Sequence, residues 1–203
     1  MREWICARIT DWRFYLFLIC TLPAALLVSA ILNGDLGANP LETIRDTTGI
    51  WTLRFLIFTL AITPLRRFMR WREIIRARRM LGLFAFFYAL LHFVSYVWLD
   101  QFFDLDGMIA DLTKRPFIMA GYASFVVLIP LAVTSTKKWI GRLGGKRWQL
   151  LHRLIYFSAA AGVVHYFWRV KLDAQSPMIY GALLGALFLA RLPKYRSLAR
   201  LNS

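Results

Sequence analysis

The sequence predicts an all-α membrane protein, a six-transmembrane-helix bundle with both termini in the cytoplasm. Hydrophobic residues make up 59% of the 203 residues and charged residues only 18%, and the apolar residues come in long blocks rather than at amphipathic spacing. This composition excludes a soluble protein. The net charge of +15 comes from basic residues that cluster beside the ends of the blocks, where membrane topology places Lys and Arg. Nucleic-acid binding is therefore not expected.

Six apolar blocks are candidates for membrane spans, because a helix needs about 20 residues to cross the hydrocarbon core. The first block follows Arg2, Arg8 and Arg13, and its length favours an uncleaved span over a signal peptide. The chain is expected to form one domain over residues 1–203, with spans at about 14–32, 49–65, 80–99, 116–134, 148–168 and 177–192.

The loops between these blocks differ sharply in charge. The N-terminus, segments 66–79 and 135–147, and the C-terminal tail hold 19 of the 26 lysines and arginines, and the other three loops hold five. The positive-inside rule places the first set and both termini in the cytoplasm and predicts six spans, a multi-pass membrane protein. Segment 66–79 has Phe68, Trp71 and Ile75 at helical spacing and is expected to lie on anionic lipid. Docking of a flavin phosphate or a cytoplasmic reductase there is the alternative.

All three histidines of the chain, His92, His152 and His165, lie inside apolar blocks. Ionisable side chains in spans usually mark function, and neutral imidazole is the natural axial ligand of haem iron. His92 stands eight residues before Asp100, and His165 stands eight residues before Asp173. Both aspartates follow their apolar blocks, and the two spans run in the same direction across the membrane. At about 1.5 Å per residue they have nearly the same depth in the outer half of the membrane. We predict that this pair binds one haem.

His152 lies about 20 Å closer to the cytoplasm than His165, and the third span offers Arg79 rather than a histidine at that depth. We expect His152 to serve the electron-input side, as a single ligand of a second haem or as a contact to a flavin or quinone. Arg54 and Arg153 are candidates to pair with a haem propionate or a phosphate. The alternatives are an interhelical hydrogen bond for each histidine and snorkelling to the membrane surface for each arginine.

Two other functional classes remain open. A histidine-relay transporter is disfavoured because no Asp or Glu lies in the middle of any block. A membrane ferric reductase would act directly on an external metal chelate. Cys6 and Cys20 form no CxxCH motif, which excludes covalent haem attachment. No catalytic residue is expected, because the chain is interpreted as an electron-transfer subunit.

The segment LHRLIYFSAAAGVVHYFW, the LLHFVSY context of His92 and the IRARRMLGL start of the third span resemble the MsrQ/YedZ family. Its members are the haem-binding membrane subunits of the bacterial periplasmic methionine sulfoxide reductase system, within the ferric-reductase-like transmembrane group. The resemblance covers essentially the whole chain. It implies haem b held by His92, His152 and His165, and bound FMN.

The resemblance also implies electron delivery to a periplasmic molybdopterin enzyme that reduces methionine sulfoxide in oxidised proteins. The electrons would come from the quinone pool or a cytoplasmic flavin reductase. The wider group has two histidines on the third span and this chain has one, so the resemblance leaves the haem count at one or two. The wider group includes the membrane domains of NADPH oxidases, which carry a C-terminal NADPH- and flavin-binding domain. This chain ends just after the sixth block, so another molecule is expected to supply the electrons. The resemblance also implies a location in the bacterial inner membrane.

Overall fold

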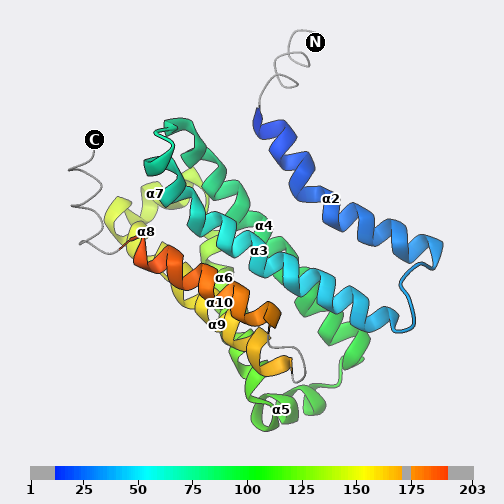
Figure 1. Ribbon diagram of the computed structural model, residues 1–203. Helices are drawn as coiled ribbons and strands as arrows, with labels where there is room; N and C mark the ends of the chain where they lie inside the picture. The colour runs from blue at the N-terminus through cyan, green and yellow to red at the C-terminus, as the bar shows by residue number, and fades with distance from the viewer. Residues whose placement is uncertain (1–11, 171–174, 192–203) are drawn as a thin grey trace.

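The computed structural model describes residues 12–170 and 175–191, and every regular element in these two ranges is a helix (Figure 1). Arg2, Arg8, Cys6, residues 192–203 and the expected location of both termini lie outside the described residues. The elements are α2 (Trp12–Asn33), α3 (Pro40–Phe68), the 3-10 helix η1 (Arg72–Arg76), α4 (Ala77–Ser95), the π-helical turn η2 (Tyr96–Asp100), α5 (Leu105–Lys114), α6 (Pro116–Val133), α7 (Lys137–Leu143), α8 (Gly145–His152), α9 (Ile155–Arg169) and α10 (Gln175–Leu189).

Four helical stretches of the described chain are long and apolar enough to cross a membrane: Trp12–Asn33, Pro40–Phe68, Arg72–Asp100 and Pro116–Val133. They contain the first three predicted spans and all but the last residue of the fourth, and the chain is a multi-pass membrane protein by this measure. The predicted sixth span holds a shorter apolar helix, α10. The predicted fifth span, 148–168, is two helices, so six continuous spans are not observed in the described part of the chain.

The interruption of the fifth span falls at Arg153 and Leu154. Their amides bond to carbonyls three residues back, as in a 3-10 turn, which ends α8 and restarts the chain as α9. Just before this turn, the indole Nε1 of Trp148 donates to the carbonyl of Thr134 at 2.9 Å, and His152 Nε2 lies 3.0 Å from the Thr134 hydroxyl. These contacts hold α8 against the C-terminal end of α6.

α3 begins at Pro40 and not at Gly49, where the apolar block starts. Asn39 caps the helix by accepting a hydrogen bond from the Glu42 amide, and proline is favoured at the first helical position. The segment interpreted from sequence as the end of a polar loop is therefore helical. The hydropathy of a segment indicates whether it faces an apolar or an aqueous environment, but it does not indicate the residue at which a helix starts. This extension forms one wall of the site described below.

Segment 66–79 is not a single helix along the membrane surface. α3 continues to Phe68, Arg70 adopts a φ of 53°, and η1 begins only at Arg72. Phe68 and Trp71 therefore do not share one helical face, contrary to the sequence interpretation. Trp71 instead packs on Trp12 of α2, with ring centroids 5.9 Å apart.

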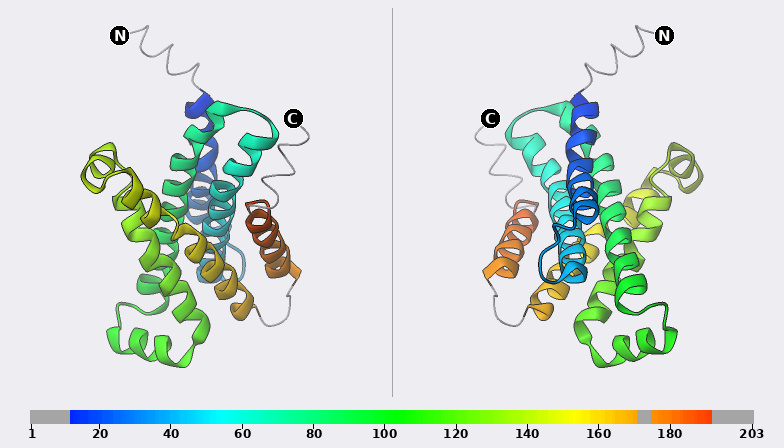
Figure 2. Two further views of the ribbon diagram at one scale, coloured as in Figure 1. Left: turned by 90° about the vertical axis from the view of Figure 1, so that its left-hand side faces the viewer. Right: turned by 90° about the vertical axis from the view of Figure 1, so that its right-hand side faces the viewer.

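The loop predicted between the third and fourth spans contains α5, which lies at the opposite end of the molecule from α7 (Figure 2). A buried carboxylate, Asp111, organises this end of the bundle. It accepts hydrogen bonds from the Tyr96 hydroxyl at 3.1 Å and from Gln101 Nε2 at 2.9 Å, and it forms an ion pair with Arg115 at 3.2 Å. This network ties η2 to the start of α6.

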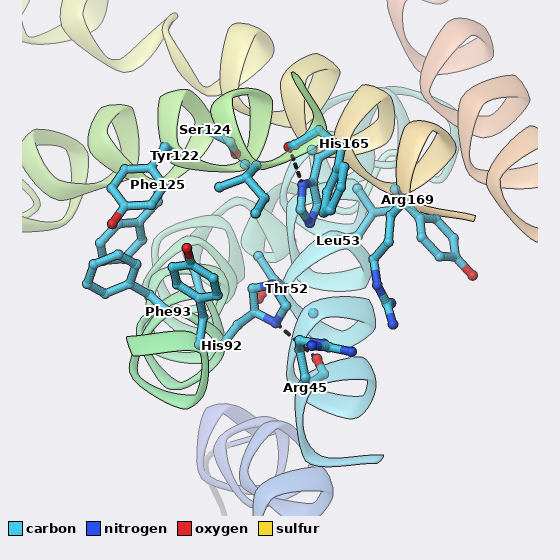
Figure 3. A pocket seen from close by; sticks show the side chains of 18 of the residues that line it. Arg45, Thr52, Leu53, His92, Phe93, Tyr122, Ser124, Phe125, His165 and Arg169 are labelled. Carbon is cyan, nitrogen blue, oxygen red and sulfur yellow. Dashed lines mark hydrogen bonds between the residues drawn. The ribbon is translucent and has the colours of Figure 1, made fainter. Parts of the chain in front are cut away.

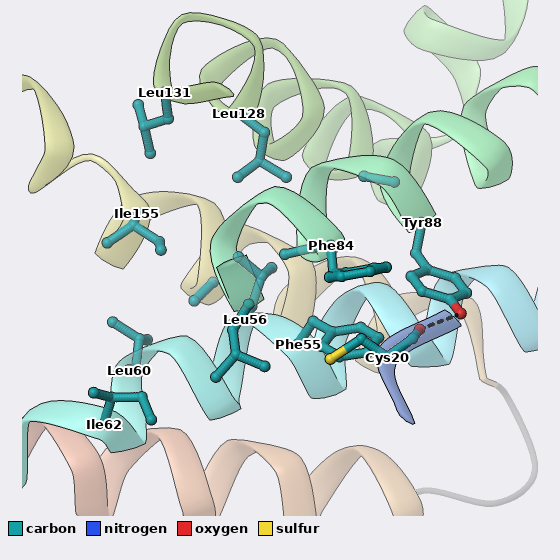
Figure 4. Close-up of a cluster of buried hydrophobic side chains, with 14 of the residues drawn as sticks. Cys20, Phe55, Leu56, Leu60, Ile62, Phe84, Tyr88, Leu128, Leu131 and Ile155 are labelled. Carbon is teal, nitrogen blue, oxygen red and sulfur yellow. Dashed lines mark hydrogen bonds between the residues drawn. The ribbon is translucent and has the colours of Figure 1, made fainter. Parts of the chain in front are cut away.

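The core lies where α3, α4, α6 and α9 meet, with Leu56, Phe84, Leu128 and Ile155 among its buried side chains (Figure 4). α2 joins this core through a polar contact. The Tyr88 hydroxyl of α4 donates to the Cys20 carbonyl at 2.9 Å and accepts from the Ala24 amide at 3.0 Å. The Tyr88 hydroxyl therefore replaces the helical hydrogen bond between the Ala24 amide and the Cys20 carbonyl, next to Pro23. A group inserted between a helical amide and carbonyl in this way bends the helix.

Candidate functional site

A cavity of about 790 Å³ opens between α3, α4, α6 and α9, at the end of the bundle that carries α5. Its volume falls within the range of about 300–1,000 Å³ that is typical of ligand sites. Aromatic side chains form much of its wall: Phe93 and Phe125 stack with their centroids 4.6 Å apart, and Tyr122 meets Phe93 edge to face. The cavity therefore offers flat apolar surfaces to a ligand.

His92 from α4 and His165 from α9 both face this cavity (Figure 3). Their ring centroids are 6.1 Å apart and their planes are inclined by 78°. The structure thus brings together the two histidines that the depth argument paired. The His92 ring connects α4 to α3, and the His165 ring connects α9 to α6.

Each of these imidazoles is oriented by a backbone carbonyl. His92 Nδ1 lies 2.9 Å from the carbonyl oxygen of Arg45, and His165 Nδ1 lies 2.6 Å from that of Phe117. A carbonyl only accepts, so each Nδ1 carries the proton and donates it. Each Nε2 is then the unprotonated nitrogen with a lone pair available to a metal. Ligating histidines usually have this second contact, which fixes both tautomer and ring orientation.

His152 does not reach the cavity. Its ring stacks on Trp148, with centroids 3.9 Å apart, and its Nε2 bonds to Thr134 at the other end of α6. The Thr134 hydroxyl donates its own proton to the Pro130 carbonyl at 2.6 Å, so His152 Nε2 is the donor in their bond. In this arrangement the nitrogen with a free lone pair is Nδ1.

The two sequence-predicted arginines also lie outside the cavity. Arg54 Nε donates to the Tyr180 hydroxyl at 3.0 Å, and its guanidinium stacks over Trp51 at 4.6 Å, which links α3 to α10. Arg153 has an exposed side chain at the break between α8 and α9.

Three other arginines line the cavity near its mouth: Arg45, Arg115 and Arg169. Arg45 pairs with Asp100 at 2.6 Å, and Arg169 pairs with Asp46 at 2.5 Å. The buried Nε of Arg45 has no hydrogen-bond partner among the described residues. Sequence analysis assigned all three to loops. Arg169 had a detectable signal, since it stands four residues after His165 and so shares its helical face.

Comparison with known proteins identifies the family of this chain. Residues 48–163 match the family described as "Ferric reductase like transmembrane component". The chain is 54% identical over 178 residues to the protein-methionine-sulfoxide reductase heme-binding subunit MsrQ of Herminiimonas arsenicoxydans, an alignment that covers 87% of this chain and 82% of that protein. The chain belongs to the MsrQ family. The members from Rhodospirillum rubrum and Caulobacter vibrioides are 48% and 45% identical and cover 89% and 92% of this chain, and 86% and 89% of their own lengths. No solved structure matches the chain.

The cavity fits the haem that the MsrQ family name implies. An imidazole nitrogen binds a transition metal at about 2 Å, so two imidazoles that hold one metal ion from opposite sides have ring centroids roughly 6 Å apart. The observed separation is 6.1 Å. Aromatic walls suit the macrocycle, and the Arg45 Nε without a partner suits a carboxylate at the mouth.

Proposed function

We propose that this chain is a haem-binding electron-transfer subunit of a protein-methionine-sulfoxide reductase system in the bacterial inner membrane. The observation that carries the proposal is the His92–His165 pair, in which both Nδ1 atoms donate to backbone carbonyls and the two ring centroids are 6.1 Å apart. The names of its relatives support the haem and the reductase system.

His92 and His165 would hold the iron of a haem b through their Nε2 atoms. When bound, that group supplies one-electron redox chemistry. The protein surrounds the cavity with aromatic side chains and fixes both rings through the carbonyls of Arg45 and Phe117. Arg45, Arg115 and Arg169 replace Arg54 and Arg153 as our candidates for pairing with the propionates, because they line the cavity.

The cavity mouth lies beside Asp100, in the segment that the charge distribution assigns to the periplasm. We therefore propose that electrons leave there, toward a periplasmic molybdopterin reductase that repairs oxidised methionine. The quinone pool or a cytoplasmic flavin reductase would supply electrons from the opposite side, where His152 and the basic segments 66–79 and 135–147 lie. FMN and a second haem at His152 are the finer parts of this proposal.

A visible spectrum of the purified protein tests the proposal, with haem and flavin quantified per chain. Six-coordinate low-spin haem gives a sharp band on reduction, and His92→Ala and His165→Ala should each abolish the signal of the outer site. Tyr180→Phe, which lies outside the cavity, serves as the control. Either histidine variant with an unchanged low-spin spectrum would refute the assigned pair.

The same preparation separates the alternatives. A histidine-relay transporter predicts no haem band at all. A ferric reductase predicts that the reduced protein is reoxidised by ferric citrate and not by a methionine-sulfoxide-reducing partner. We expect the methionine-sulfoxide-reducing partner to reoxidise the reduced protein faster than ferric citrate does.

A further inference from the structure

Each of the two facing imidazoles lies against a glycine of a neighbouring helix. A β-carbon at Gly49 of α3 would stand 3.0 Å from Cε1 and 3.1 Å from Nδ1 of His92. A β-carbon at Gly121 of α6 would stand 2.8 Å from Nδ1 and 3.0 Å from Cε1 of His165. Carbon contacts are normally about 3.5–4.0 Å, so neither ring could keep its place beside an alanine.

Each glycine stands four residues after the residue whose carbonyl orients the neighbouring ring. The His92 acceptor is the carbonyl of Arg45, four residues before Gly49, and the His165 acceptor is the carbonyl of Phe117, four residues before Gly121. Residues four apart stand one above the other on a helix. Each helix therefore offers the same cradle, a carbonyl that accepts the Nδ1 proton and a glycine one turn later that leaves room for the ring.

Backbone conformation does not explain these glycines. Both lie inside helices and neither has a positive φ, so an L side chain is compatible with the backbone. Glycine inside a helix costs about 0.5–1 kcal/mol relative to alanine. Gly162 lines the same cavity, yet a β-carbon there would meet its nearest neighbour at an ordinary 3.7 Å. Close contact with a histidine ring is specific to the two cradles.

We propose that Gly49 and Gly121 are positioning residues that set the orientation of the His92 and His165 rings, and through them the ligand field of the bound iron. This inference rests on the proposed function for its redox consequence. Its steric part concerns the glycine–histidine contacts alone and stands without a bound group.

The first test compares Gly49→Ala and Gly121→Ala with wild type and with Gly82→Ala. Gly82 lies on α4 with His92, but its β-carbon would meet Thr59 Cγ2 at 3.7 Å and it does not line the cavity. The readouts are haem per chain, the g-values of the low-spin ferric signal in electron paramagnetic resonance, and the midpoint potential. We expect shifted g-values and several-fold lower haem retention in both cradle variants, with the larger effect at Gly121, and no change in Gly82→Ala.

The second test is a double-mutant cycle of thermal stability, Gly121→Ala with His165→Ala. If the glycine acts through the ring, the loss caused by Gly121→Ala disappears once His165 is alanine. Equal losses in both backgrounds, or cradle variants with wild-type g-values and haem content, would overturn the inference. Wild-type protein without haem would overturn the proposed function instead, while the cycle would still decide the steric contact.

Discussion

His152 on α8 donates a hydrogen bond from Nε2 to the hydroxyl of Thr134 at the end of α6, over 3.0 Å. This is the interhelical bond that stood as the alternative to a role in electron transfer. The two roles are compatible, because the bond leaves Nδ1 unprotonated and the ring lies near the basic segment 135–147.

Two variants separate the roles of His152. His152→Ala removes both the imidazole and the bond, whereas Thr134→Val keeps the imidazole and removes the bond, together with the bond from the Thr134 hydroxyl to the Pro130 carbonyl. We expect both to lower stability by about 1 kcal/mol, the usual value of such a bond, and to leave the low-spin spectrum of the outer site intact. Only His152→Ala should slow haem reduction by a cytoplasmic flavin reductase or quinol at matched haem content. A wild-type reduction rate in His152→Ala would make the residue purely structural.

Charge removal at the cavity mouth should lower the midpoint potential of the outer site. Arg45→Gln deletes a positive charge and leaves the Asp100 carboxylate unpaired, and both changes favour the oxidised, more positive form of the iron. We expect a fall of tens of millivolts, since about 59 mV corresponds to about 1.4 kcal/mol for one electron. Arg169→Gln should act in the same direction. Redox titration measures the effect, and Arg54→Gln, outside the cavity, should leave the potential unchanged.

Topology can be tested by labelling single cysteines in a background with Cys6 and Cys20 replaced. Arg70 and Asp106 are both exposed and lie in segments assigned to opposite sides of the membrane. In intact cells with a permeabilised outer membrane, an impermeant maleimide should label Asp106→Cys and spare Arg70→Cys. A permeant reagent should label both. Labelling of position 70 by the impermeant reagent would invert the orientation.

Hydropathy was sufficient for the helical class and for four spans, and the depth argument paired the two histidines whose rings the structure brings together. The fourth block, 116–134, corresponds closely to α6, which is Pro116–Val133. The fifth block misled because the apolar run continues through Leu150, Leu151 and Leu154 across the turn between α8 and α9, and the contacts that hold α8 are made to Thr134, which lies outside that run.

The site was only half predictable for a related reason. The histidines could be identified because they are rare in apolar blocks. Their orienting groups, the carbonyls of Arg45 and Phe117, are backbone atoms that every residue has, so no residue type marks them. Arg54 seemed suited to a propionate only while α3 was thought to start at Gly49. With the helix starting at Pro40, Arg45 takes that place on the cavity wall.

The contact between α6 and α9 offers a stability prediction with a site readout. Ser124 Oγ donates to the Ser158 carbonyl at 2.9 Å, and Ser158 Oγ donates to the Ser124 carbonyl at 3.2 Å, with both side chains buried. Interhelical hydrogen bonds in membranes contribute about 0.6 kcal/mol on average. Ser158→Ala should therefore lower stability slightly and keep the low-spin spectrum.

Ser158→Val should behave differently, because Ser158 is completely buried and the added methyl groups have no free volume. Such overpacking costs about 1–3 kcal/mol, and here it would separate α6 from α9. The His165–Phe117 bond bridges the same two helices, so the His165 ring should lose its acceptor and the protein should retain less haem. Thermal unfolding and haem content of the two Ser158 variants measure the difference. Equal haem retention in both would show that the α6–α9 spacing does not control the His165 ring.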